Sequence, residues 1–124
     1  YSTLNKPSLN PPNYLFGPVW SVLYILMGIG LYLILQTPKS AMRTKSIMLF
    51  AVQLILNLSW SFVFFNAQSP LAALIIIGIL WIAILMMMIY FHTVSPIASY
   101  LQIPYLLWVS FASVLNAAIW LLNK

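Results

Sequence analysis

The chain has 124 residues, of which 64% are hydrophobic, 15% are aromatic and 4% are charged, and it contains five Lys and Arg but no Asp, Glu or Cys. These absences exclude paired-carboxylate catalysis, carboxylate metal sites, carboxylate proton relays, disulfides and zinc–thiolate sites. Soluble proteins are about 45–50% apolar, so this composition and a mean hydropathy of +1.03 indicate a surface that faces lipid.

Prolines and charges divide the chain into four apolar stretches. Each has about 20 residues, enough for a helix to cross the ~30 Å hydrocarbon layer, and lipid disfavours open strands because the backbone must satisfy its own hydrogen bonds. We therefore predict an all-α, polytopic helix bundle in one membrane domain, residues 1–124, with a lid-like loop over residues 1–15. The helices are expected at about 16–36, 46–66, 70–91 and 98–122, with breaks near 37–45, 67–69 and 92–97.

Three prolines refine these helices. Pro18 and Pro70 suit a first helical turn, where the missing N–H costs nothing. Pro104 falls inside the last stretch, where we expect a kink or a break near the start of the helix.

The positions of the charges suggest an orientation. If the end of the bundle at Phe16 is called the upper end, the cluster Lys39, Arg43 and Lys45 lies at the lower end, and the first and last cations of the chain, Lys6 and Lys124, lie at the upper end. Three cations against two place the lower end in the cytoplasm. Residues 1–13 are then expected at the same face as Lys124.

Three helices carry a face that joins an aromatic residue to small or polar ones. Spacings of three and four residues place side chains on one helix face, and the three sets are Trp20, Tyr24, Met27 and Leu31; Gln53, Asn57, Trp60 and Phe64; and Trp108, Ala112 and Asn116. Most of them lie in the upper half of the membrane, where they could form one pocket.

The same pattern also suits packing. Trp81 and Trp120 fit core or interface-anchor roles, whereas for Trp20, Trp60 and Trp108 the pattern leaves a shared pocket and plain packing both open.

The polar residues also allow both a structural and a functional interpretation. Asn57, Gln53 and Asn116 fit either interhelical hydrogen bonds or a functional site. His92, the one histidine, is a candidate haem or metal ligand, but it lies at the lower end, far from the aromatic residues, so we interpret it as a loop residue and predict no metal site. Lys45, Phe50 and Val52 fit the inverted cholesterol pattern, whereas the forward pattern is absent near the C-terminus because no Tyr follows Leu115.

Three segments resemble a known family. LNKPSLNPPNYLFGPVWSVLYILMGI, QLILNLSWSFVFF and IPYLLWVSFASVLNAAIWLLN, at residues 4–29, 53–65 and 103–123, resemble the first loop and second helix, the third helix and the fifth helix of the tryptophan-rich sensory protein / translocator protein (TspO/MBR) family. That family has five helices, so the resemblance implies that the family's first helix is missing here and that the sequence is a fragment. Such a chain should expose a groove to lipid.

The resemblance implies a pocket between the helices, capped by the first loop, for porphyrins, cholesterol-like sterols and isoquinoline or benzodiazepine ligands, with a porphyrin as ligand and not as cofactor. By motif position its residues are Tyr1, Pro11, Trp20, Tyr24, Asn57, Trp60, Trp108 and Ala112. Trp20 and Trp108 match tryptophans linked to light-dependent porphyrin breakdown and would be the catalytic residues if the protein is an enzyme. The absent forward cholesterol pattern favours a bacterial-type member in the bacterial cell membrane, and the family implies a homodimer.

Three function classes remain at this point. The first is a membrane receptor or translocator of tetrapyrroles and similar flat apolar ligands, whose partners are the bilayer and porphyrin or haem-like molecules but no nucleic acid. The second is a porphyrin-degrading enzyme that uses Trp photochemistry. The third is a small multidrug exporter, disfavoured because proton-coupled export normally needs a carboxylate inside the membrane; a purely structural membrane protein is the default alternative.

Overall fold

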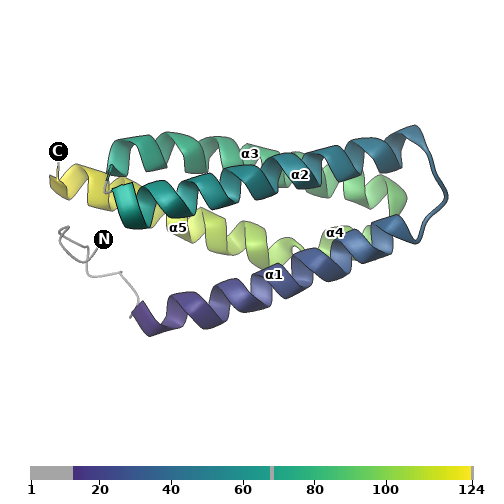
Figure 1. Ribbon diagram of the computed structural model, residues 1–124, viewed down its shortest axis with the longest axis horizontal. Helices are drawn as coiled ribbons and strands as arrows, with labels where there is room; N and C mark the ends of the chain where they lie inside the picture. Colours follow the sequence, from purple (N-terminus) through teal and green to yellow (C-terminus); the bar gives the residue numbers. More distant parts are fainter. Residues whose placement is uncertain (1–12, 68, 124) are drawn as a thin grey trace.

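A computed structural model describes residues 13–67 and 69–123 of the chain. Its helices are α1 (Asn13–Leu35), α2 (Ala41–Phe62), the π-helical segment η1 (Val63–Ala67), α3 (Pro70–Val94), α4 (Pro96–Tyr100) and α5 (Ile103–Asn123). Figure 1 shows them as an up-and-down bundle. The predicted all-α membrane bundle is confirmed, since four stretches are long and apolar enough to cross a membrane: Gly17–Leu35, Ala41–Ala67, Pro70–Val94 and Pro96–Asn123.

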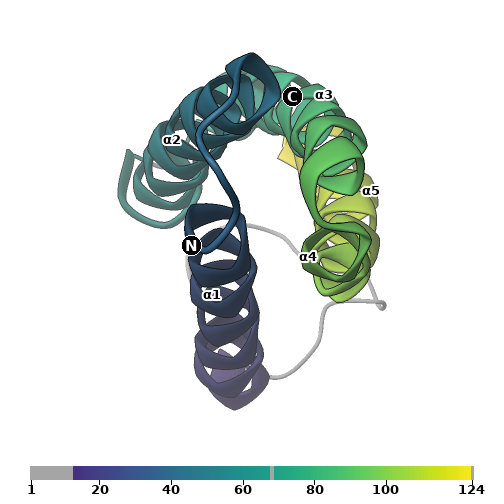
Figure 2. The ribbon, with the colours of Figure 1, turned by 90° about the vertical axis from the view of Figure 1, so that its right-hand side faces the viewer.

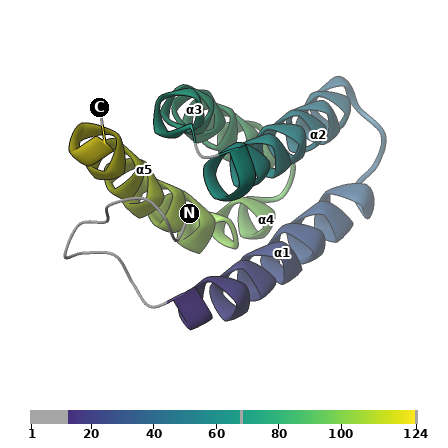
Figure 3. The same ribbon diagram turned by 60° about the vertical axis from the view of Figure 1, so that its left-hand side comes forward.

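The bundle is packed less closely around α1 than around α3. Helix α3 packs against α2, α4 and α5, whereas α1 packs against α2 and the short α4. Figures 2 and 3 show α1 on the opposite side of the bundle from α3, next to α2. The upper half of α1 and the first half of α5 therefore face each other across a space that the aromatic side chains described below partly fill.

The described helix ends follow the predicted depths. The start of α1, the end of η1, the start of α3 and the end of α5 lie at one end of the bundle, and the connection from α1 to α2 lies at the other (Figure 1). The cluster Lys39, Arg43 and Lys45 is at that second, lower end, because it lies in this connection and in the first turns of α2. Residues 1–12 and Lys124 lie outside the described residues, so the expected position of the N-terminal segment beside Lys124 and the site roles of Tyr1 and Pro11 stay predictions.

Two helices begin earlier in the structure than the sequence predicted. Helix α2 begins at Ala41, earlier than predicted, because the Ser40 hydroxyl accepts the Arg43 backbone N–H at 3.1 Å and caps the helix. Residues 13–15, predicted as part of the lid, belong to α1.

At its lower end α3 continues to Val94 before the chain turns at Ser95. The interpretation of His92 as a loop residue is therefore wrong, because His92 lies in the last turn of α3, with Nε2 3.3 Å from the Tyr100 hydroxyl.

The predicted break near Pro104 is confirmed. Leu101 and Gln102 form a turn between α4 and α5, and Pro104 lies in the first turn of α5, where its missing N–H leaves no acceptor unpaired. Gln102 is fully buried there and donates through Nε2 to the Leu26 backbone carbonyl at 3.0 Å. This bond ties the turn to α1.

Gly30 allows α1 to approach α4 closely. A Cβ at Gly30 would collide with Gln102 Nε2 and would lie 3.3 Å from the Ala98 carbonyl oxygen, whereas a Cβ at Gly28 would meet nothing within 4 Å. We predict that Gly30→Ala lowers the free energy of unfolding by roughly 1–3 kcal/mol relative to Gly28→Ala, because the buried Gln102 amide must move and lose its bond. Thermal unfolding of both variants in the same detergent measures the difference. Equal midpoints would show that the α1–α4 contact tolerates a methyl group.

Candidate functional site

Four polar side chains join three helices in the interior of the bundle. The Tyr24 hydroxyl of α1 donates to Asn57 Oδ1 of α2 at 2.5 Å, and Asn57 Nδ2 donates to the Tyr105 hydroxyl of α5 at 2.9 Å. The Tyr105 hydroxyl in turn donates to Gln53 Oε1 at 2.7 Å, and Gln53 Nε2 lies 3.9 Å from the Met27 sulfur. Since Gln53, Asn57 and Tyr105 are fully buried, this network fixes how α1, α2 and α5 align along the membrane normal.

Another buried amide, Asn116, joins three helices near the upper end of the bundle. Asn116 accepts the Trp60 indole N–H at 3.0 Å and donates to the Pro70 carbonyl oxygen at 2.9 Å. The Trp60 ring also stacks on Phe64, with centroids 4.9 Å apart and planes 19° apart. Trp60 is 2% exposed, so in this arrangement it packs and positions other groups.

Trp20 is the centre of an aromatic cluster. Its ring centroid lies 5.9 Å from that of Tyr24, 6.2 Å from Trp60, and 6.4 Å from both Tyr105 and Trp108. The planes of Trp20 and Trp108 are 89° apart, the edge-to-face geometry that aromatic quadrupoles favour. The tryptophans of the first and last spans, predicted to share a site, are therefore in contact.

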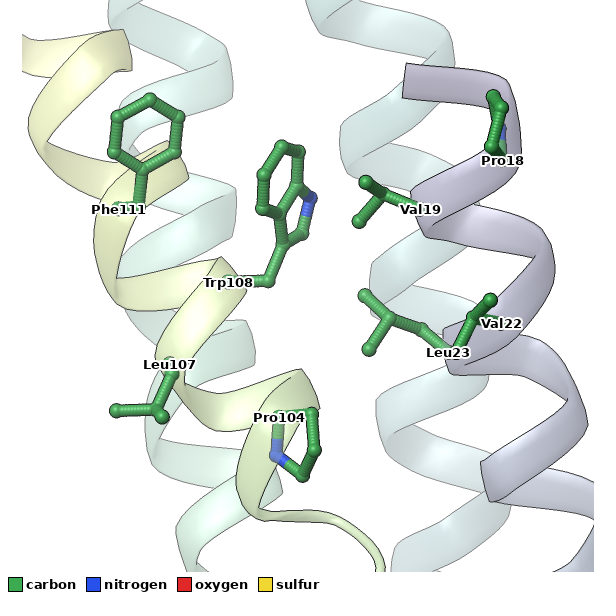
Figure 4. A pocket seen from close by; sticks show the side chains of 8 residues that line it. All are labelled: Pro18, Val19, Val22, Leu23, Pro104, Leu107, Trp108 and Phe111. Carbon is green, nitrogen blue, oxygen red and sulfur yellow. The ribbon is translucent and has the colours of Figure 1, made fainter. Parts of the chain in front are cut away.

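A groove of about 570 Å³ opens between α1 and α5 beside this cluster. This volume is within the roughly 300–1,000 Å³ typical of small-molecule sites. Figure 4 shows the Trp108 indole projecting from α5 toward Val19 of α1. The groove is lined by Pro18, Val19, Val22, Leu23, Pro104, Leu107, Trp108 and Phe111. Val22 and Leu107 are more than half exposed, so the groove is open on the outer surface of the bundle.

The predicted site residues occupy different positions relative to the groove. Trp108 lines it, Trp20 contacts Trp108 from the bundle interior, and Tyr24 is 36% exposed on α1. Asn57 and Ala112 are buried and are not among the lining residues. A ligand-binding role for any of these residues, and for Trp60, stays a prediction.

Sequence reasoning missed Tyr105 and most of the groove. Tyr105 lies three residues before Trp108 and seven before Ala112, so extending the aromatic face of α5 by one turn would have found it. The aliphatic lining residues carry no such signal, because Val and Leu occur throughout the chain. Within residues 13–67 and 69–123, no three His, Cys, Asp or Glu side chains gather in a way that could hold a metal ion.

Comparison with known proteins agrees with the motifs. A family model described as the TspO/MBR family matches residues 1–121. The chain is 53% identical over 124 residues to "Tryptophan-rich protein TspO" of Chlorobaculum tepidum, covering 99% of this chain and 78% of that protein. It is 46% identical over 124 residues to a protein of the same name from Archaeoglobus fulgidus, covering 99% of this chain and 79% of the relative.

A eukaryotic relative is also similar over most of its length. The human "Translocator protein" is 36% identical over 123 residues, which cover 97% of this chain and 72% of that protein. Together with the four membrane-length helices, these matches show that the chain is an integral membrane protein that belongs to the TspO/MBR family.

Proposed function

We propose that this protein binds porphyrins and related flat apolar ligands in the groove between α1 and α5, as a receptor or translocator. The observation that carries the proposal is the position of Trp108, whose indole forms a wall of the groove while it contacts Trp20 edge to face. Porphyrin is the ligand class that the family resemblance implies. An apolar groove that is open to lipid suits a ligand that partitions into the bilayer.

The two walls of the groove suit a flat ligand. Trp108 and Phe111, whose ring centroids lie 5.4 Å apart, offer aromatic surface from α5, and Val19 and Leu23 offer aliphatic surface from α1. A macrocycle between them would stack on the indole and displace lipid from the exposed lining residues.

The polar network would support the site without contacting the ligand, except through Tyr24. Asn57 uses both its carbonyl oxygen and its amide nitrogen on tyrosine hydroxyls, in Tyr24 and Tyr105. Asn57 would therefore position the two tyrosine rings that contact Trp20. On this proposal Asn57 is a positioning residue, and Tyr24, which is partly exposed, is the network member that a ligand could reach.

A second candidate function is light-dependent breakdown of the bound porphyrin. The contact between Trp20 and Trp108, and the buried Tyr105 ring 6.4 Å from Trp20, support electron transfer through the aromatic cluster. An excited porphyrin would take an electron from Trp108 and pass it to dioxygen. The Trp108 radical cation would then take an electron back from the porphyrin, so that the net reaction is oxidation of the porphyrin by dioxygen. In this case Trp108 and Trp20 would be the catalytic residues.

A bulky side chain in the groove tests the first proposal. Val22 lines the groove and is 55% exposed, whereas Ile25, on the same helix, is 61% exposed and is not among the lining residues. We predict that Val22→Trp weakens protoporphyrin IX binding about tenfold, or ~1.4 kcal/mol, and that Ile25→Trp leaves it unchanged. Titration by absorbance and Trp fluorescence measures both affinities. Equal affinities in the two variants would place the ligand outside this groove.

Replacement of the indole separates binding from photochemistry. Trp108→Phe keeps an aromatic ring, so we predict that it weakens protoporphyrin IX binding by only ~1 kcal/mol. If the protein degrades porphyrin, the same change nearly abolishes bleaching under light and air, while Trp120→Phe, at the upper end of α5, bleaches like the wild type. Bleaching rates compared at equal porphyrin occupancy decide between the functions. A wild-type rate in Trp108→Phe would remove Trp108 from the reaction.

A further inference from the structure

A second groove lies at the lower end of the bundle, between α2 and α3. It has a volume of about 240 Å³ and is lined by Lys45, Met48, Leu49, Val52, Met86 and Tyr90. It shares no lining residue with the groove between α1 and α5. Nothing in the proposed porphyrin function uses it.

The lining residues are ordered by depth. Lys45 is four residues from the start of α2 and Tyr90 is four residues from the end of α3, so both lie about 6 Å from the helix ends at 1.5 Å per residue. Leu49 and Met86 follow one turn deeper, and Val52 deeper still. The groove is therefore polar at the lower membrane surface, at headgroup depth, and its apolar part runs about 10 Å from there into the hydrocarbon. An amphiphilic lipid has its polar and apolar parts in the same order.

The charge on Lys45 has no carboxylate partner. The sequence contains no Asp or Glu, so no side chain among these 124 residues can supply a carboxylate counter-ion to Lys45. Arg43, which is near it, already donates through Nη2 to the Leu35 carbonyl oxygen at 3.2 Å, and Lys39 lies before α2 and outside the groove lining. Lys45 is thus the cation of this cluster that faces the groove.

From these observations we infer that the α2–α3 groove binds an anionic phospholipid. The phosphate lies at Lys45 and the Tyr90 hydroxyl, and one acyl chain lies along Leu49, Met86 and Val52. A sterol fits less well, since its neutral hydroxyl leaves the Lys45 charge uncompensated. The three residues of the inverted cholesterol pattern do not line this groove together, because Phe50 packs against the hydrophobic core and is not among the lining residues.

Lipid retention measured by native mass spectrometry tests this site. The protein is purified in a mild detergent, and equal amounts of phosphatidylglycerol and phosphatidylcholine are added. Wild-type protein is expected to retain phosphatidylglycerol in preference, and Lys45→Gln is expected to lower its retention about fivefold, whereas Lys45→Arg keeps it. Lys39→Gln removes the same charge at the same end of the bundle and is expected to stay near wild type.

A bulky side chain placed in the apolar part of the groove tests whether an acyl chain binds there while Lys45 is unchanged. Val52→Trp is expected to lower phosphatidylglycerol retention, while Ile55→Trp, on an exposed part of α2 outside the lining, is expected to leave it unchanged. Equal losses in Lys45→Gln and Lys39→Gln would overturn the inference in favour of diffuse attraction between charges. Displacement of the lipid by millimolar inorganic phosphate would overturn it as well, because the phosphate alone would then account for binding.

Discussion

Lipid offers no hydrogen bonds to the interior of a helix bundle, so buried amides and hydroxyls there depend on partners in neighbouring helices. Among the described residues, the amide side chains of Gln53, Asn57, Gln102 and Asn116 are fully buried and hydrogen-bonded to neighbouring helices or turns. Their bonds connect α1, α2, α3 and α5 at defined heights. A shift of α1, α2 or α5 by one turn would leave several buried polar groups unpaired, and these bonds therefore set the register on which the rest of the structure depends.

That register also determines the shape of the aromatic cluster. Because Tyr24 and Tyr105 share Asn57, their rings are both held against Trp20, and Trp108 completes the cluster at the groove. Each bond is worth only about 0.6–2 kcal/mol in a membrane. The rings nevertheless gain a fixed geometry, which stacking on a flat ligand requires and which flexible aliphatic packing alone would not provide.

The sequence predicted the four spans and the break at Pro104, because hydropathy and proline chemistry are local properties. That Trp20 and Trp108 lie together was implied by the family resemblance, since helical spacing left a shared pocket and plain packing both open. The sequence did not predict the early start of α2, which depends on one hydrogen bond from Ser40, or the π-helical end after Phe62. Helical spacing identifies a face but not the helix that this face meets. For this reason the sequence did not identify the α1–α5 groove, which Val19 and Leu107 line and in which the buried Asn57 and Ala112 take no part.

Cysteine protection tests the central claim, that the α1–α5 groove holds the porphyrin, most directly. The sequence has no Cys, so Leu107→Cys places a single thiol in the groove, and Ile82→Cys places one on the exposed face of α3, outside the groove lining. Maleimide labelling rates are measured in detergent with and without protoporphyrin IX. The account predicts that the porphyrin slows labelling at position 107 and leaves position 82 unchanged. Equal rates at position 107 with and without porphyrin, under conditions where the porphyrin is bound, would contradict it.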